Sequence, residues 1–291
     1  MSQSDLLLVT GASGQLGQLV VTELLKTVPA ARIVALVRSD AAAALYAAKG
    51  VATRRGDYAE PATLDVALAG IGRVLLISSS AIGQRAAQHG NVIAAARHAG
   101  VGQIVYTSIL HADTSPLGLA VEHVDTEAAL KASGVPFVVL RNGWYNENHA
   151  AGIPSALAHH AVFGSAGDGR FSSAARVDFA AAAAVALTTA ADWNGRVFEL
   201  AGDDSYTLTD LAAELTKQSG EQIGYVNLPE ADFKAALLGA GLPEPIANLL
   251  SNSDAGAAKG GLFDDSHQLS TLIGRPTTKL AATIAQALAK R

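Results

Sequence analysis

The chain contains no cysteine. It can therefore form no disulfide, and it offers no thiolate nucleophile, iron–sulfur ligand or cysteine ligand for zinc. Aromatic residues are also scarce, at 5% of the sequence. The core must accordingly be built from aliphatic side chains and alanine, and several kinds of redox and metal chemistry are excluded before any motif is considered.

Charge and long apolar runs are limited as well. Charged residues make up 16% of the 291 residues and hydrophobic residues 49%, a composition that excludes a disordered chain. The net charge is −5 and no segment concentrates Lys and Arg, so we expect no nucleic-acid partner. The longest strongly apolar run without charge, 179–191, is shorter than the roughly 20 residues that a membrane span needs. Because residues 1–5 also lack the positive start of a signal peptide, we expect a cytoplasmic protein with no membrane partner.

The first 140 residues alternate between two kinds of segment. Runs rich in Val, Ile and Leu predict buried strands at 6–10, 33–37, 74–77, 104–107 and 137–140, with a weaker one at 51–55. Segments with helical spacing lie between them, at 15–26, 41–49, 61–69, 84–98 and 121–132. Buried strands that alternate with helices indicate an α/β fold, a doubly wound parallel sheet of the Rossmann-like type.

The pattern changes after residue 141. The segments 163–166 and 171–174 flank a glycine turn and predict a hairpin, followed by a helix at 177–190 and a strand at 197–201. The remaining segments predict helices at 208–219, 230–240, 243–250, 268–273 and 279–290, and one strand at 223–228. We expect a cofactor-binding domain at 1–150 and a smaller, mostly helical lobe at 151–291 that covers the substrate, with 175–201 returning to the sheet.

A glycine-rich loop joins the first strand to the first helix. It has the spacing Gly-x-x-Gly-x-x-Gly, and its candidate cofactor-binding residues are Gly11, Ala12, Ser13, Gly14, Gln15, Leu16 and Gly17. The first glycine allows a tight turn, the second lets the backbone approach a pyrophosphate, and the third lets the helix pack closely on the strand. The helix N-terminus then offers N–H groups to the phosphates. This context predicts a dinucleotide site.

The second strand ends at Arg38, where NAD-binding proteins usually carry Asp or Glu for the ribose 2′-hydroxyl. A guanidinium suits a 2′-phosphate instead, although Asp40 lies nearby. A solvated arginine at a strand end is the alternative. Arg38 therefore favours NADP over NAD as the cofactor.

Polar residues also follow the later strands. Ser78, Ser79 and Ser80 follow the strand at 74–77, and Asn142, Gly143, Trp144, Tyr145, Asn146 and Glu147 follow the strand at 137–140. Asp57 and Tyr58 follow the weaker strand and are placed to flank the adenine. Because ligands bind outside the carboxyl ends of the strands in open parallel sheets, we assign all of these residues to the cofactor site.

With these residues noted, the chain resembles the NmrA-like branch of the atypical short-chain dehydrogenases, and within it the bacterial members that reduce quinones with NADPH. The resemblance rests on the segments 10–17, 75–80, 106–118, 140–145 and 259–265. It implies that Gly11–Leu16, Arg38, Ser78–Ser80 and Asn142–Glu147 line the cofactor. It also implies that Tyr145 and the loop 110–118 face the substrate, and that a hydride passes from NADPH to a quinone without flavin.

One departure from typical short-chain dehydrogenases concerns the Tyr-x-x-x-Lys pair, in which lysine lowers the tyrosine pKa for acid–base work. No lysine follows Tyr145 at that spacing. The helix in which the pair would be expected instead carries His123 and Glu127, one turn apart. His123, paired with Glu127, is therefore a candidate proton donor, and Tyr145 is another. A purely structural pair of His123 with Glu127 on the helix surface is the equal alternative. A quinone needs little help, because the anion formed by hydride addition is resonance-stabilised and can take a proton from water or a modest donor.

Other functions stay open on the sequence alone. The same branch includes reductases of conjugated acceptors such as triphenylmethane dyes, and non-catalytic proteins that sense NAD(P). His159 and His160 lack a third ligand at metal spacing, so we expect no metal. The expected partners are a small quinone-like substrate and a second copy of the chain in a homodimer.

Overall fold

The structure, a computed structural model, describes residues 5–290. The start of the chain, 1–4, for which the sequence predicts no secretory signal, lies outside the described residues. Two compact units divide the chain. One takes in residues up to Ile109, Val121–Arg141 and Phe179–Phe198, and the other takes in Leu110–Ala120, Asn142–Asp178 and the residues from Glu199 onward. The segment 179–198 thus belongs to the first unit, while a division of binding roles at residue 150 stays a prediction.

The first unit is organised around a seven-stranded sheet with the order β3-β2-β1-β4-β5-β6-β8. The pairs β1–β2, β1–β4, β2–β3 and β4–β5 are all parallel. The strand bounds are β1 Leu7–Val9, β2 Ile33–Val37, β3 Ala52–Arg55, β4 Arg73–Leu76, β5 Gln103–Ile109, β6 Phe137–Asn142 and β8 Arg196–Leu200. The order reverses between β1 and β4, which is the switch point where doubly wound sheets bind ligands.

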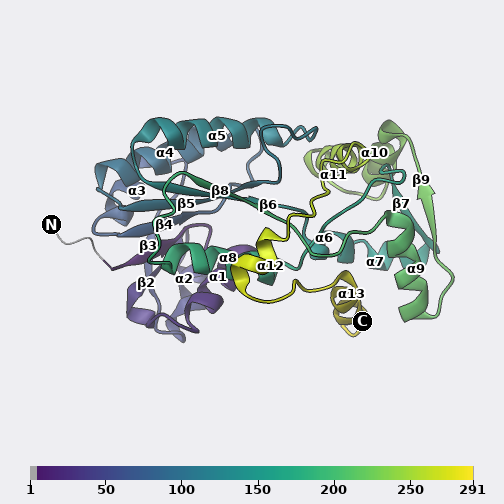
Figure 1. The fold of residues 1–291 in the computed structure, drawn as a ribbon, viewed down its shortest axis with the longest axis horizontal. Coiled ribbons are helices and arrows are strands. Elements are labelled where there is room, and N and C mark those ends of the chain that lie inside the picture. The colour runs from purple at the N-terminus through teal and green to yellow at the C-terminus, as the bar shows by residue number, and fades with distance from the viewer. Residues whose placement is uncertain (1–4, 291) are drawn as a thin grey trace. The chain divides into compact units, whose positions relative to one another are not determined.

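Helices cover both faces of this sheet, with α3, α4 and α5 on one face and α1, α2 and α8 on the other (Figure 1). Their bounds are α1 Gln15–Leu24, α2 Asp40–Ala47, α3 Pro61–Leu68, α4 Arg85–His98, α5 Ala120–Ser133 and α8 Arg176–Thr188, with a short 3₁₀ helix at Ala30–Arg32. This arrangement follows from right-handed crossovers between parallel strands. The doubly wound α/β fold predicted from the sequence is confirmed.

The burial of the strands explains which of them the sequence predicted well. Every residue of β1, β2 and β5 is buried, because helices cover both faces. The edge strand β3 has no fully buried residue, which is why its apolar pattern is weak. Side chains such as Leu64 and Val92 from the helices pack on Leu8 and Ile104 of the strands.

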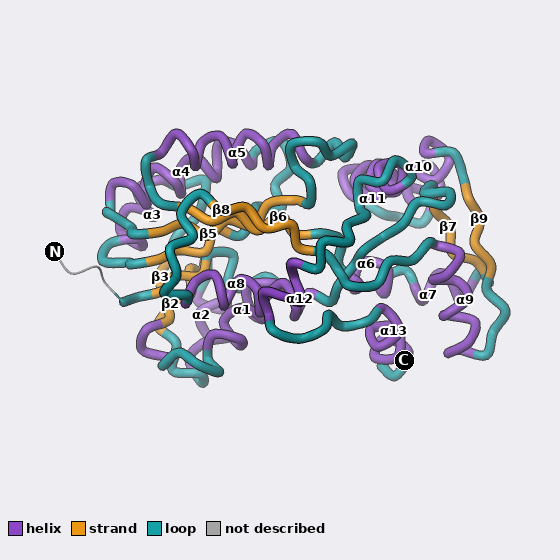
Figure 2. Tube along the Cα trace, in the orientation of Figure 1, coloured by secondary structure: helices purple, strands orange, loops and turns teal. Residues whose placement is uncertain are grey.

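The second unit is mostly helical. Its helices are α6 Asn146–Ala150, α7 Ile153–Ala158, α9 Leu208–Ser219, α10 Glu230–Gly239, α11 Glu244–Ala257, α12 Gln268–Ile273 and α13 Leu280–Leu288. Two short strands, β7 Ala161–Gly164 and β9 Gly224–Asn227, form a separate parallel sheet (Figure 2). A capping box at Thr207 and Asp210 fixes the start of α9, whose bounds the sequence predicted.

The hairpin predicted around the glycine turn is wrong. The strand β7 pairs with β9, from distant sequence, and residue Phe171 instead forms an isolated antiparallel bridge with Tyr206. Ala174 forms a parallel bridge with Tyr145. The strand β7, Ala161–Gly164, overlaps the first predicted segment, whereas 171–174 holds only the two bridge residues Phe171 and Ala174. The choice of partner depends on contacts that the local pattern does not contain.

Candidate functional site

The glycine loop lies at the carboxyl end of β1 and leads into α1. Gly11 has a φ of +55°, in the left-handed region that glycine tolerates at little cost. A Cβ added to Gly17 would lie 2.4 Å from the Gly11 carbonyl oxygen and 2.7 Å from the Ala12 Cα. Both glycines are therefore required by the turn and by the close approach of helix and loop. Ser13, Gly14 and Gln15 are exposed to solvent, as a phosphate-binding loop requires.

Thr10 and Tyr58 tie the strand ends together at the switch point. The Thr10 hydroxyl donates to the Leu75 carbonyl oxygen at 2.8 Å and accepts from the Ile77 N–H at 3.0 Å. The Tyr58 hydroxyl contacts the Thr10 hydroxyl and donates to the Ile77 carbonyl oxygen at 2.9 Å. Tyr58 was assigned to the adenine site, and the structure places its hydroxyl between the ends of β1 and β4.

Arg38 and Asp57 lie beside each other at the ends of β2 and β3. An Arg38 guanidinium nitrogen lies 3.9 Å from an Asp57 carboxylate oxygen, and the Arg38 side chain is 76% exposed. A pair this exposed holds its partners weakly. The guanidinium is therefore available to a ligand phosphate at the strand end where the sequence placed it.

The loop at Ser78–Ser80 is held by side chains from the helices behind it. The Ser79 N–H donates to His89 Nε2 at 2.9 Å, and His89 Nδ1 lies 2.9 Å from the Thr126 hydroxyl. The Arg85 Nε donates to the Ser79 carbonyl oxygen at 2.5 Å. Burial, with a smaller contribution from the Arg85 charge, lowers the pKa of His89 to about 4. His89 therefore stays neutral and keeps accepting from Ser79.

The predicted pairing of His123 with Glu127 is wrong. His123 Nδ1 lies 2.7 Å from the Tyr106 hydroxyl, and the ring is 3% exposed. Burial, reinforced by the Arg85 charge, lowers the pKa of His123 to about 3. The ring is thus neutral near pH 7 and buried, which does not favour a role as proton donor.

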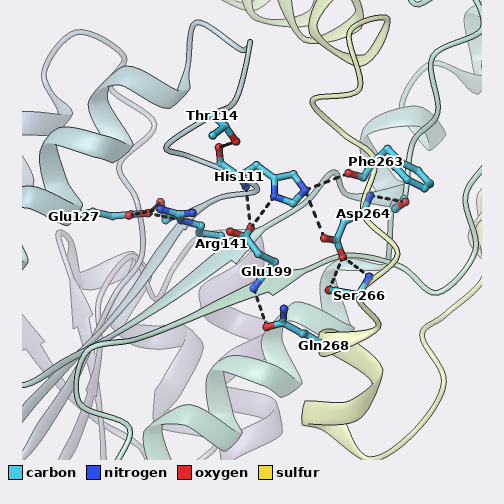
Figure 3. A network of polar contacts seen from close by, with 11 residues as sticks. His111, Thr114, Glu127, Arg141, Glu199, Phe263, Asp264, Ser266 and Gln268 are labelled. Atoms are coloured by element: carbon cyan, nitrogen blue, oxygen red, sulfur yellow. Dashed lines mark hydrogen bonds and ion pairs between the residues drawn. The ribbon is translucent and has the colours of Figure 1, made fainter.

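Glu127 takes part in a different buried cluster. One of its carboxylate oxygens accepts from the Ser108 hydroxyl at 2.6 Å and from Arg141 Nε at 3.0 Å, and the other accepts from Arg141 Nη2 at 2.8 Å. Figure 3 shows the two planar groups side by side. Glu127 thus links Ser108 at the end of β5 to Arg141 at the end of β6.

The end of β6 and the segment after it contain two kinds of side chain: some are hydrogen-bonded to the protein, and others have buried polar atoms without a partner. Asn146 is fully buried and accepts from Ser173 at 2.6 Å, and Glu147 accepts the Arg176 N–H at 3.0 Å, at the start of α8. By contrast, Asn142 Oδ1 and Trp144 Nε1 are buried and have no hydrogen-bond partner within residues 5–290. Such atoms are typical of a site that a ligand or an ordered water completes.

Tyr145 contacts the cation of a neighbouring residue. The Arg176 guanidinium lies 4.6 Å from the centre of its ring. Burial raises the pKa of Tyr145, and this outweighs the opposing effects of the Asn142 hydrogen bond and of Arg176. The phenol can donate a hydrogen bond but releases its proton less readily than a free tyrosine.

His111 lies at the start of the loop 110–118, which was expected to face the substrate, but no individual role was predicted for it. Its φ is +51°, and its N–H donates to Glu199 Oε2 at 2.8 Å. Its ring nitrogens lie 3.6 Å from Glu199 and 3.5 Å from Asp264, so that two carboxylates flank the imidazole (Figure 3). Strained backbone at a residue other than glycine marks a position that its surroundings enforce.

The rest of this loop is anchored on α11. The Gly118 N–H donates to Asn252 Oδ1 at 2.8 Å. A Cβ on Gly256 or Gly261 would lie within 2.8 Å of Leu117 Cδ1. The small residues after and within α11 therefore fix the loop in place.

These features agree with comparisons to known proteins. Residues 3–286 match the NmrA-like family. The chain belongs to this family. It is 58% identical to quinone oxidoreductase 2 of Escherichia coli (strain K12) over 276 residues, which cover 95% of this chain and 96% of that one.

Two solved structures match nearly the whole chain. The crystal structure of the NADPH-dependent quinone oxidoreductase QOR2 from E. coli, complexed with NADPH, has a TM-score of 0.95 at 56% identity and covers 97% of this chain and 100% of its own. The Citrobacter sp. triphenylmethane reductase complexed with NADP(H) has a TM-score of 0.93 at 36% identity, with coverages of 97% and 99%. The resemblance inferred from the motifs is confirmed.

Within residues 5–290 no helix is long and apolar enough to span a membrane. The same residues contain no group of three or more His, Asp or Glu side chains arranged to hold a metal ion.

Proposed function

We propose that the protein transfers a hydride from NADPH to a quinone and uses no flavin. The observation that carries this proposal is the 58% identity to quinone oxidoreductase 2 of E. coli over 95% of this chain. The Rossmann-like sheet, the glycine loop at its switch point and Arg38 in place of an acidic residue support NADP as the cofactor.

The residues present fit this cofactor. We propose that Gly11–Gly17 hold the pyrophosphate and that Arg38 contacts the 2′-phosphate. Ser78–Ser80 and Asn142–Tyr145 would border the nicotinamide half. The buried Asn142 Oδ1, which lacks a protein partner within the described residues, suits a hydroxyl or amide donor of the ligand. Asn146 and Glu147 would act by holding this segment in shape, because their side chains bind the protein itself.

When bound, NADPH supplies the hydride, and a quinone that accepts it then needs one proton. Tyr145 and His123 were the candidate donors. The raised pKa of Tyr145 and the lowered pKa of buried His123 make both poor sources of that proton near pH 7. We propose that water supplies it and that Tyr145 orients the acceptor through its phenol.

An assay of NADPH oxidation with a small benzoquinone or naphthoquinone tests the function. We expect NADPH absorbance in the near ultraviolet to fall only when quinone is present, with no added flavin. Tight NADPH binding without turnover of any acceptor would instead support a non-catalytic sensor.

Arg38→Ala should raise the KM for NADPH at least about tenfold and leave the KM for NADH nearly unchanged, because a charge-assisted bond to the 2′-phosphate contributes about 1.5–3 kcal/mol. Arg32→Ala is the matched control, since Arg32 precedes β2 at its opposite end and contacts Asp5 on the surface. Equal losses with both cofactors would contradict the assignment of Arg38.

Reduction of triphenylmethane dyes is the second candidate activity, favoured by the 36% identity to the Citrobacter reductase over nearly the whole chain. Including such a dye in the same acceptor panel distinguishes dye reduction from quinone reduction.

We also propose that the protein is a cytoplasmic homodimer. Light scattering measures the mass of the assembly and so tests the dimer.

A further inference from the structure

Each backbone carbonyl oxygen at the turn of the glycine loop is occupied by a donor from the protein. The Gly11 oxygen accepts from the Gly14 N–H at 3.0 Å, and the Gly14 oxygen accepts from the Gln18 N–H at 3.0 Å. The Ser13 oxygen accepts from Gln18 Nε2 at 2.8 Å. All three donors belong to the loop or to α1, so they are part of the local turn.

The Ala12 carbonyl oxygen is different, because its donor comes from elsewhere in the unit. It accepts from the Tyr46 hydroxyl at 2.5 Å. Tyr46 lies in the last turn of α2, and its side chain is fully buried. Burial raises the pKa of Tyr46 to about 12, so the hydroxyl keeps its proton and remains a donor over the physiological range.

This bond fixes the direction of the next N–H group. The described residues contain no cis peptide bond, and in a planar trans peptide the C=O and the N–H point in opposite directions. With the Ala12 oxygen held toward Tyr46, the Ser13 N–H must point away from it. Ala12 is buried and Ser13 is exposed, so this N–H is directed away from the packed side of the loop.

We propose that Tyr46 is a positioning residue for NADPH, which holds the Ala12–Ser13 peptide so that its N–H, and not its carbonyl oxygen, faces the pyrophosphate. A flipped peptide would place a negative carbonyl end against the negative phosphates. Because α2 begins at Asp40, the helix that follows Arg38 also supplies the residue that orients the phosphate loop. The inference rests on the proposed cofactor site and adds to it a residue outside the glycine motif.

Tyr46→Phe keeps the ring and removes only the donor. We expect the dissociation constant for NADPH to rise about tenfold, which corresponds to about 1.4 kcal/mol, with kcat little changed, because the Ala12–Ser13 peptide is no longer held in its binding orientation. Adenosine 2′-monophosphate has the 2′-phosphate but no pyrophosphate, so its binding should change by less than about twofold. Calorimetry with both ligands measures the two constants.

Two further variants make the result decisive. Tyr225→Phe also removes one hydroxyl donor, to Asn227 at 2.8 Å in the small sheet, and should change neither constant. Arg38→Ala should weaken both ligands. If Tyr46→Phe weakens both ligands equally, or neither, the inference is overturned. If Arg38→Ala also leaves both unchanged, the proposed cofactor site itself is wrong.

Amide hydrogen exchange on the unsubstituted protein gives an independent measurement if Tyr46→Phe does not fold. NADPH should slow exchange at the Ser13 amide, while adenosine 2′-monophosphate should leave it unchanged. An exchange rate at Ser13 that NADPH does not alter would overturn the inference.

Discussion

Glu127→Ala should lower the free energy of unfolding by about 3–5 kcal/mol, the loss seen when one partner of a buried ion pair is removed. The Glu127 and Arg141 side chains are only 5% and 8% exposed. The substitution removes two bonds to Arg141 and one to Ser108 at once. Urea unfolding at pH 7.5 measures the loss.

Two other variants test the assignment. Glu127→Gln keeps one acceptor oxygen and the side-chain volume, so it should lose less than Glu127→Ala. Glu23→Ala removes a carboxylate 2.6 Å from Lys26, whose side chain is 62% exposed, and should cost less than about 1 kcal/mol. If Glu127→Ala costs no more than Glu23→Ala, the buried cluster does not stabilise the fold.

The protein should lose stability steeply as the pH falls below about 6.5. Burial lowers the pKa of His89 and His149 to about 4 and that of His123 to about 3, compared with 6.5 in an unfolded chain. Between these values the unfolded state binds more protons than the folded state, so protonation favours unfolding. At pH 5 each histidine should cost about 2 kcal/mol relative to neutral pH.

One carboxyl group works in the opposite direction. Burial raises the pKa of Asp254 to about 6. Its protonation therefore stabilises the folded protein as the pH falls through that value. It should offset about 1 kcal/mol of the histidine effect at pH 5. The net result is still a loss, because three histidines oppose a single carboxyl group.

His149→Phe isolates one of the three histidines. The His149 ring packs edge-on against Phe171, with 4.9 Å between the ring centroids. Its Nε2 has no hydrogen-bond partner within the described residues, so a phenyl ring replaces it without breaking a bond at that atom. The free energy of unfolding, measured in urea between pH 7 and pH 5, should fall less steeply with pH in this variant. The difference in slope should correspond to nearly one proton. A packing cost that is the same at every pH does not affect this slope, and an unchanged slope would contradict the assignment.

The fold of the first unit follows from local pattern to a large extent. Buried parallel strands are continuous apolar runs, so β2 and β5 are visible in the sequence, and the glycines at 11, 14 and 17 mark the turn after β1. The hairpin prediction was wrong because the pairing of β7 does not follow from local pattern. Two segments that flank a glycine turn predicted a local pair of strands, but β7 takes its partner from β9, about 60 residues away, and no local signal specifies that choice.

The candidate site shows the same division. The positions of Arg38 and of the glycine loop at strand ends could be predicted from the sequence, because each directly follows a buried apolar strand. The roles of His123 and Glu127 could not be, since one helical turn of spacing allows a pair between them as readily as contacts with Tyr106, Ser108 and Arg141. Burial decides between these, because a buried charged carboxylate is stabilised by a cation and hydrogen bonds, and a buried imidazole stays neutral.

Absent cysteine, scarce aromatic residues and the glycine loop followed by Arg38 determined, from the sequence alone, an α/β dinucleotide-binding protein that depends on a bound hydride carrier. Only the tertiary structure decided which polar side chains hold one another. Tyr46 and His89 carry no motif, yet they direct the Ala12 carbonyl oxygen and the Ser79 N–H. The physical reason is that hydrogen bonds between residues 10 and 34 positions apart depend on how helices pack on a sheet, whereas local spacing records only what lies within a turn or a strand.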